Sequence, residues 1–175
     1  MPHVAVTALG ADRPGIVAAV TGVLMRHGGN LEDTAMTNLG GHFAMMLVVE
    51  VPDGEGADAL ERALVAEVAD LGLTVAVRPI ADRPAGVADG EPYAVSLYGA
   101  DRPGIVHAVT QALASHGANI VDLSTRIVGK GAYVLLLELS LPPSADGAAL
   151  GAELQRLAGE LGVEIHFRPD DADVF

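Results

Sequence analysis

The apolar residues near the start of the chain change from the spacing of a strand to that of a helix. Residues 3–9, HVAVTAL, form a short apolar stretch in which the valines are spaced as in a strand. Gly10 is expected to end this strand. After Pro14 the apolar positions follow one face of a helix: Ile16, Val17, Val20, Val23 and Leu24. Gly28 follows shortly after this helical stripe, and a helix commonly ends at such a glycine. A strand and then an amphipathic helix are therefore predicted.

The following residues predict two more strands, a second helix and a last strand. Residues 30–38 are expected to form a strand, and glycines 40 and 41 supply the turn before the apolar strand HFAMMLVVEV. A second helical stripe consists of Leu60, Ala63, Leu64, Val68 and Leu71, and LTVAVRP forms the last strand. This β-α-β-β-α-β order predicts an α+β, ferredoxin-like unit, an antiparallel four-stranded sheet with two helices on one face.

The whole pattern occurs twice. GADRPGIV stands at 10–17 and again, unchanged, at 99–106, and HGGN at 27–30 is matched by HGAN at 116–119. LGLTVAVRP and LGVEIHFRP lie 90 rather than 89 positions apart, so one residue is inserted where the hairpin turn is expected. We therefore predict two domains, residues 1–80 and 92–169, joined by a linker at 81–91 rich in proline, glycine and aspartate and followed by an acidic tail at 170–175.

The third strand of each unit is apolar on both faces. In FAMMLVVEV the positions of both parities carry apolar residues, although a sheet with helices on one face only is expected to be polar on the other. We expect these open faces to be covered by the sister domain or by a second chain, which makes a homo-oligomer the expected state.

Charge and composition exclude several classes of function. The net charge of −13 opposes direct binding to nucleic acid or to anionic lipid, and the few aromatic residues argue against an RNA-recognition sheet. The sequence lacks cysteine, so it has neither disulfides nor a thiolate nucleophile. We find neither a signal peptide nor an apolar stretch of membrane-spanning length, and we expect a cytoplasmic protein that does not contact a membrane.

The repeated GADRPGIV lies at the turn from the first strand into the first helix. We expect Asp12 or Arg13 to cap the helix, with Pro14 in its first turn. Gly15 would leave the backbone N–H groups of the helix start accessible, and such groups bind carboxylates. The same residues also form a stable turn and cap, so the sequence alone leaves a structural role and a binding role open.

Catalytic and metal-binding patterns are not found. His27 and His116 fall at the ends of helices, where a cationic ring suits the helix dipole. The other histidines lack metal-binding spacing, and neither a catalytic triad nor paired carboxylates stand out. We expect a non-enzymatic protein without a metal or a cofactor.

The strand, the DRPGIV turn, the amphipathic helix and HGxN together resemble the ACT domain, a small regulatory module that binds amino acids. The ADRPGIVAAVTGVL version is similar to the ACT domains of glycine cleavage system repressors and of formyltetrahydrofolate deformylases, and a chain with two such units most resembles the repressors. The resemblance implies a protein that senses a small amino acid, glycine or serine, and acts on a partner, for instance a DNA-binding regulator.

The resemblance also implies where the amino acid binds. ACT ligands usually lie between two units, held by the first loop of one unit and the start of the second strand of its neighbour. The corresponding residues here are Asp12, Arg13, Pro14, Gly15, Ile16, Asn30 and Leu31, and Asp101, Arg102, Pro103, Gly104, Ile105, Asn119 and Ile120. Asn30 also suits a helix exit. Two alternatives are a ligand-free interaction module and, less favoured, a small enzyme built on the sheet.

Overall fold

The computed structural model describes residues 2–54, 56–81, 90–129 and 131–170. The chain divides into two compact units, Met1–Ala85 and Gly86–Phe175, each described here by itself. The elements of unit 1 are β1 (His3–Ala11), α1 (Ile16–Arg26), β2 (Asn30–Leu39), β3 (His42–Glu50), α2 (Ala57–Glu67), a 3-10 turn (Ala69–Leu71) and β4 (Thr74–Ile80). The elements of unit 2 are β5 (Glu91–Ala100), α3 (Ile105–Ser115), β6 (Asn119–Val128), β7 (Ala132–Leu141), α4 (Gly147–Leu161) and β8 (Val163–Pro169).

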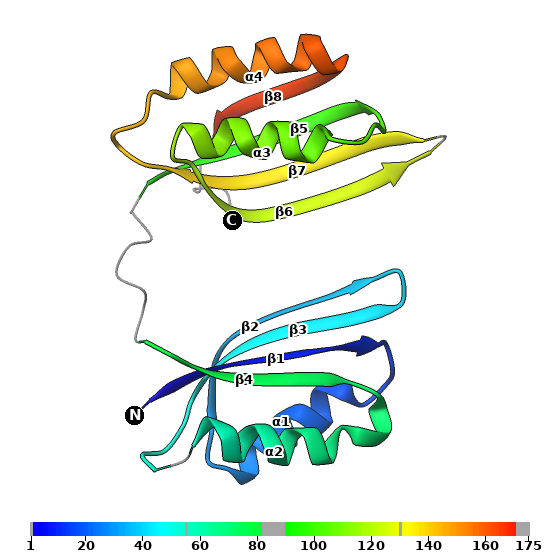
Figure 1. The fold of residues 1–175 in the computed structure, drawn as a ribbon, viewed down its shortest axis with the longest axis vertical. Coiled ribbons are helices and arrows are strands. Elements are labelled where there is room, and N and C mark those ends of the chain that lie inside the picture. The colour runs from blue at the N-terminus through cyan, green and yellow to red at the C-terminus, as the bar shows by residue number, and fades with distance from the viewer. Residues whose placement is uncertain (1, 55, 82–89, 130, 171–175) are drawn as a thin grey trace. The chain divides into compact units, whose positions relative to one another are not determined.

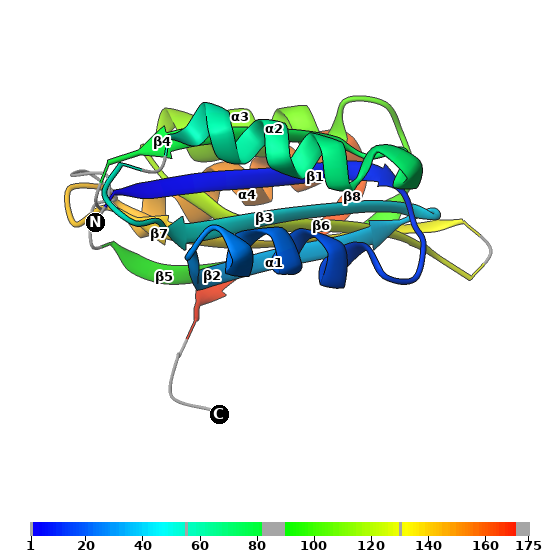
Figure 2. The ribbon, with the colours of Figure 1, turned by 90° about the horizontal axis from the view of Figure 1, so that it is seen from below.

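Each unit is one antiparallel sheet with its two helices on the same face (Figure 1, Figure 2). The strand order is β2-β3-β1-β4 in unit 1 and β6-β7-β5-β8 in unit 2. The two inner strands of each sheet are thus the first and third in sequence, and the helices lie in the crossovers. The predicted ferredoxin-like α+β fold is confirmed in both halves of the chain.

The core of each unit is aliphatic and lies between its sheet and its helices. In unit 1 the fully buried residues include Val6 and Leu47 from the sheet and Val20 and Leu64 from the helices. Unit 2 repeats this arrangement and adds one aromatic pair, in which the rings of Tyr93 and Phe167 stack at 4.7 Å. The strand residues of one parity and the helix stripes predicted from the sequence meet in these cores.

Both second strands carry the same irregularity. The register of β2 against β3 shifts between Leu31 and Asp33, and that of β6 against β7 shifts between Ile120 and Asp122. Glu32 and Val121 are therefore extra residues that no partner in the ladder opposes. Such bulges bend a strand locally and change the direction in which a side chain points.

The first strand does not end at Gly10, as the sequence had predicted, but continues through it to Ala11. A Cβ atom at Gly10 would lie 2.9 Å from the Gly72 carbonyl oxygen, and one at Gly99 would lie 2.6 Å from Val163 Cγ1. These glycines let the last strand of each unit approach closely, a common reason for glycine inside a strand.

The predicted domain boundaries stay a prediction. Residues 82–89 of the predicted linker and 171–175 of the predicted tail lie outside the described residues. Strand β5 begins at Glu91, one residue before the predicted start of the second domain. The amide of Asp170 donates a hydrogen bond to the Pro92 carbonyl at 2.8 Å, so this residue continues the pairing of β8 with β5. None of the described helices is long and apolar enough to cross a membrane.

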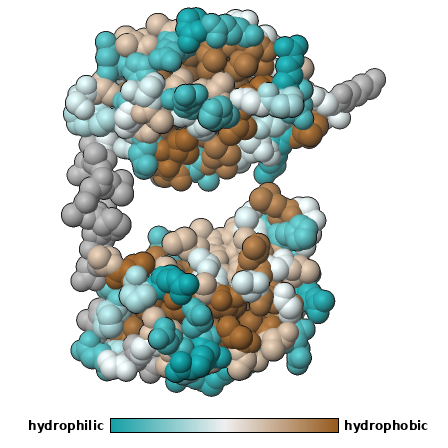
Figure 3. Space-filling view, in the orientation of Figure 1, coloured by the Kyte–Doolittle hydropathy of each residue, from teal (hydrophilic) through white to brown (hydrophobic). Residues whose placement is uncertain are grey.

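Each unit leaves apolar side chains exposed on its sheet, and apolar surface is visible among polar surface on the face drawn in Figure 3. On the sheet face away from the helices, Leu9 and Met46 of unit 1 are about half exposed, and so are Tyr98 and Leu136 of unit 2. Every residue of the edge strand β2 is exposed, and β6 is nearly as open. Natural proteins generally cover or protect a long exposed edge strand of this kind.

Candidate functional site

The repeated loop has the same backbone conformation in both units. Helix α1 begins at Ile16 after Gly15, whose φ and ψ are 95° and −9°, and α3 begins at Ile105 after Gly104, with 94° and −8°. The predictions that Asp12 or Arg13 caps the helix and that Pro14 lies in its first turn are therefore wrong, because the N-cap is Gly15. The turn needs a residue in the left-handed region at this point, which glycine adopts without the strain that a side chain brings.

The starts of α1 and α3 are open. Neither helix has a side-chain cap, whereas Asp146 caps α4 by accepting from the amides of Ala148 and Ala149. A Cβ atom at Gly15 or Gly104 would have nothing within 4 Å. The N–H groups of the first turn carry the positive end of the helix dipole and attract anions. The uncapped starts of α1 and α3 thus both lie next to open space.

Asp12 is engaged within unit 1. Its amide donates to the Gly41 carbonyl at 2.9 Å, and its Oδ2 accepts from Asn38 Nδ2 at 2.6 Å, so it ties the loop to the β2–β3 turn. Unit 2 has Ile127 at the position of Asn38. The Asp101 carboxylate accordingly makes no hydrogen bond with the described residues, and the two aspartates differ although their sequences agree.

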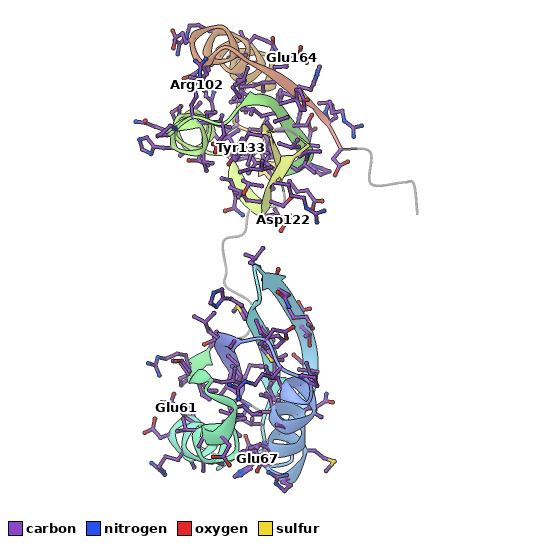
Figure 4. All side chains as sticks on the ribbon, turned by 90° about the vertical axis from the view of Figure 1, so that its right-hand side faces the viewer. Glu61, Glu67, Arg102, Asp122, Tyr133 and Glu164 are labelled. Atoms are coloured by element: carbon purple, nitrogen blue, oxygen red, sulfur yellow. The ribbon has the colours of Figure 1, made fainter. Side chains whose placement is uncertain are left out.

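The two arginines occupy matching positions. Arg13 Nη1 lies 3.5 Å from the Asp70 carbonyl oxygen. Arg102 is labelled in Figure 4, and its Nη1 lies 3.4 Å from the Leu161 carbonyl oxygen at the end of α4. A cation at the carboxyl end of a helix is favourable. These contacts give the repeated arginine a structural role in both units, and the exposed guanidinium retains further donors.

The other repeated residues contribute backbone or packing. Ile16 and Ile105 are 2% and 1% exposed, so their side chains belong to the cores of the two units. Pro14 and Pro103 are exposed just before the left-handed glycines. Much of the identity between the two loops therefore follows from the fold itself, and the exposed aspartate and proline are the residues that packing explains least.

The strand-two residues lie far from the loop of their own unit. Asn30 and His3 both pair with Glu50, whereas Ala11, next to the loop, pairs with His42 at the other end of β3. Eight residues of strand separate the two levels, which corresponds to about 26 Å. Asn119 and Ile120 occupy the same place in unit 2, opposite Ser140 and Leu139. A single unit does not bring its loop and its Asn30 or Asn119 together.

Asn30 and Leu31 begin the edge strand β2 and are both exposed, as is Asn119, while Ile120 is half-buried. The outer edge of this strand pairs with no other strand among the described residues. These residues are consequently accessible along the open edge of the sheet.

His116 has a partner that its position in the sequence did not reveal. Its Nε2 lies 2.7 Å from Glu153 Oε2, so the ring joins the end of α3 to the middle of α4. The predicted place at the helix end is correct, since His116 is the C-cap of α3 and His27 that of α1. This contact adds a connection between the two helices, which sequence reasoning missed because 37 residues separate the two side chains.

Unit 2 also has a shallow polar hollow on the sheet face away from its helices. The cavity measures about 330 Å³ and is lined among others by Ser96, Asp122, Glu138 and Arg168. The alternation of side chains along a strand could have placed these residues on the open face, since they alternate with the residues that point into the core. Unit 1 has Val48 where unit 2 has Glu138, so the hollow is not a repeated feature.

Comparisons with known proteins agree with this architecture. The ACT domain family model matches twice, over residues 3–78 and 91–168. The glycine cleavage system transcriptional repressor of Escherichia coli is 28% identical over 167 residues, which cover 93% of this chain and 87% of the repressor.

Two solved structures are similar over nearly the whole chain. The crystal structure of an unknown protein from Galdieria sulphuraria is 28% identical in sequence, with a TM-score of 0.81 over 97% of this chain and 98% of that chain. A structure that carries the name of the same repressor has a TM-score of 0.73 at 19% identity, with the same coverage, and shows the shared fold. With two family matches on two complete ferredoxin-like units, this chain belongs to the ACT domain family as a tandem ACT protein.

Proposed function

We propose that this protein senses a small amino acid, glycine or serine, and passes the bound state to a partner. The observation that carries the proposal is the duplicated loop, in which Gly15 and Gly104 leave an uncapped helix start open in almost the same conformation. A helix start of this kind suits the carboxylate of an amino acid. An amino-acid-sensing regulatory role accords with the family and with the repressor relative.

The proposed site contains one loop and one strand start from different units. The amides after Gly15 or Gly104 hold the carboxylate, and the amide side chain of Asn30 or Asn119 bonds to the carboxylate or the ammonium. An aspartate balances the ammonium. Asp101 is better suited to this than Asp12, since Asp12 already accepts from Asn38. The arginines contribute positive charge beside the carboxylate.

Pairing between units supports this arrangement. Because loop and strand start are about 26 Å apart within a unit, a ligand that contacts both must bridge two units. The exposed edge strands β2 and β6 and the exposed Met46 and Leu136 offer surfaces for such pairing. We propose that two units of one chain, or of two chains in a homo-oligomer, complete each site.

The effect on a partner follows from linkage. A ligand that binds one arrangement of the units better than another shifts the population toward it, and a partner that prefers that arrangement then responds. We propose a DNA-binding regulator as the partner, since the net charge of −13 opposes direct contact with DNA. The proposed role is regulatory and does not include catalysis by this chain.

The test is a thermal unfolding screen of the full chain against the twenty amino acids, followed by calorimetry with glycine and serine. A ligand at 100 times its dissociation constant adds about 2.7 kcal/mol to the free energy of unfolding. Gly15→Val and Gly104→Val, which place side chains over the helix starts, should each reduce the number of bound ligands, and together they should abolish the stabilisation.

A matched control separates the lost site from backbone strain. Gly54, in the turn after β3, has φ of 94° and equally open surroundings, so Gly54→Val brings comparable strain away from the starts of α1 and α3. This variant should retain the stabilisation by the ligand. If none of the amino acids stabilises the wild-type chain, the alternative of a ligand-free interaction module is correct instead.

A further inference from the structure

Three metal-ligating side chains converge on the sheet of unit 1, far along the sheet from the loop. His3 comes from β1, Glu50 from β3, and Glu32 from the bulge of β2. Their ligand atoms all lie within 4.8 Å of one another, and His3 Nε2 is 3.1 Å from Glu32 Oε2. It is the one such group of three among the described residues.

The register of the sheet explains why these side chains meet. His3 pairs with Glu50, and both have the parity opposite to the buried Val4 and Val49, so they lie on the face away from the helices. Glu50 stands on the strand between the other two. The bulge adds Glu32 to β2 at this level, and its carboxylate reaches across β3 to the histidine ring.

The second unit shows that the fold does not require this group. The positions of His3, Glu32 and Glu50 are taken there by Pro92, Val121 and Ser140, while the strand pairing and the bulge are the same. Without its three ligands the scaffold is unchanged. The side chains are therefore an addition specific to unit 1.

The chemistry of the group is that of a transition-metal site. Glu32 and Glu50 bring two carboxylates close together beside the imidazole, and like charges placed side by side are unfavourable unless a cation is shared. Zn²⁺ binds imidazole nitrogen at about 2.0–2.1 Å and carboxylate oxygen at about 2.0–2.2 Å, so two tetrahedral ligands are about 3.3 Å apart. The His3–Glu32 distance is already close to this value, and rotation of the partly exposed Glu32 adjusts the rest.

We propose that unit 1 binds a divalent transition metal ion, Zn²⁺ in particular, through His3, Glu32 and Glu50. The imidazole favours such an ion over Ca²⁺ or Mg²⁺, which prefer oxygen ligands alone. Three protein ligands leave at least one coordination position on the open face for water or for a donor from another molecule. This goes beyond amino-acid sensing and uses none of the loop residues.

The experiment is calorimetric titration of metal-stripped full chain with ZnCl₂. Wild type should bind one Zn²⁺ per chain, and His3→Ala and Glu50→Gln should each weaken binding by at least about tenfold, the loss that even outer-shell changes cause. Substitution with Co²⁺ should give the visible spectrum of a site with nitrogen and oxygen ligands. Unfolding curves in EDTA should show that both variants fold like wild type.

His116→Ala is the matched control, because it removes a histidine that also contacts a glutamate, Glu153, but without a third ligand nearby among the described residues. It should bind Zn²⁺ like wild type. The proposal is overturned if wild type does not bind Zn²⁺ at micromolar concentrations, or if His3→Ala binds as well as the control. Zn²⁺ binding is measured without any amino acid, so this outcome is independent of the proposed sensor function.

Discussion

Units 1 and 2 have one fold and one loop conformation but different exposed chemistry. They agree where the backbone requires a given residue, as at Gly10 and Gly99 against the last strand and at the left-handed Gly15 and Gly104. They differ on the sheet face away from the helices, where unit 1 has His3 and Glu50 and unit 2 has Pro92 and Ser140. Identity between two copies of a domain is therefore not by itself a sign of binding, because folding alone retains many of the matches.

The separate cores give the strongest test of whether the units are independent. Leu47 and Leu137 occupy matching, buried positions in the third strands, and replacing either with alanine should lower the free energy of unfolding of its own unit by about 2–5 kcal/mol. All three tyrosines, at 93, 98 and 133, belong to unit 2. Leu137→Ala should shift the urea transition seen by tyrosine fluorescence, while Leu47→Ala should shift only the circular dichroism signal. If Leu47→Ala instead shifted both signals equally, the two units would unfold together.

The strand glycines should be the next most sensitive positions. A methyl group at Gly10 meets a backbone carbonyl and one at Gly99 meets Val163, so Gly10→Ala and Gly99→Ala should each cost about 1–3 kcal/mol. Urea unfolding measures the loss in each unit. Gly159→Ala, on α4 with nothing within 4 Å of the added atom, serves as the control and should not destabilise the protein. A neutral Gly10→Ala would mean that β4 shifts away at little cost.

The second helices of the units differ in their caps, and this difference can be reversed. Asp146 caps α4 with two hydrogen bonds, whereas α2 begins after Gly56 without a side-chain cap. Asp146→Ala should cost about 1 kcal/mol, and Gly56→Asp should gain a few tenths, because aspartate exceeds glycine slightly as a cap. Thermal unfolding of both variants measures the expected loss and the expected gain in stability. Destabilisation by Gly56→Asp would contradict the extended, open geometry of this cap position.

The smallest expected effect concerns the loop aspartates. Asp12→Ala removes the bond from Asn38 and should cost about 0.5 kcal/mol, the low end for an exposed hydrogen bond, whereas Asp101→Ala should be neutral without ligand. Chemical unfolding in replicate resolves a difference of this size. Should Asp101→Ala prove the more destabilising of the two, Asp101 has a structural role that its surroundings do not explain.

The helices, strands and hairpin turns could be predicted because each depends on local pattern. Apolar spacing located α1 and β3, and the paired glycines of the hairpin have the positive φ values that such turns need. The predicted helix start was wrong since general capping preferences favour aspartate, while the Pro14–Gly15 turn places the helix boundary later. The predicted strand end at Gly10 was wrong because the close approach of Gly72 and Leu73, just before β4 and more than sixty residues away, decides the role of that glycine.

Residues brought together by the sheet could not be found from spacing. Histidine motifs in the sequence are sought within one helix or loop, whereas His3, Glu32 and Glu50 come from three strands and meet only through their register. The distance between the loop and Asn30 likewise follows from strand direction. Pairing of strands is the information that the sequence pattern lacked in both cases.

The bulge shared by β2 and β6 has a consequence for how duplicated modules diverge. A residue outside the ladder can be exchanged without disturbing the alignment of its neighbours, and here one copy has glutamate and the other valine at the same point. At such a position, one copy of a duplicated domain can gain or lose a functional side chain by a single substitution while its fold stays the same.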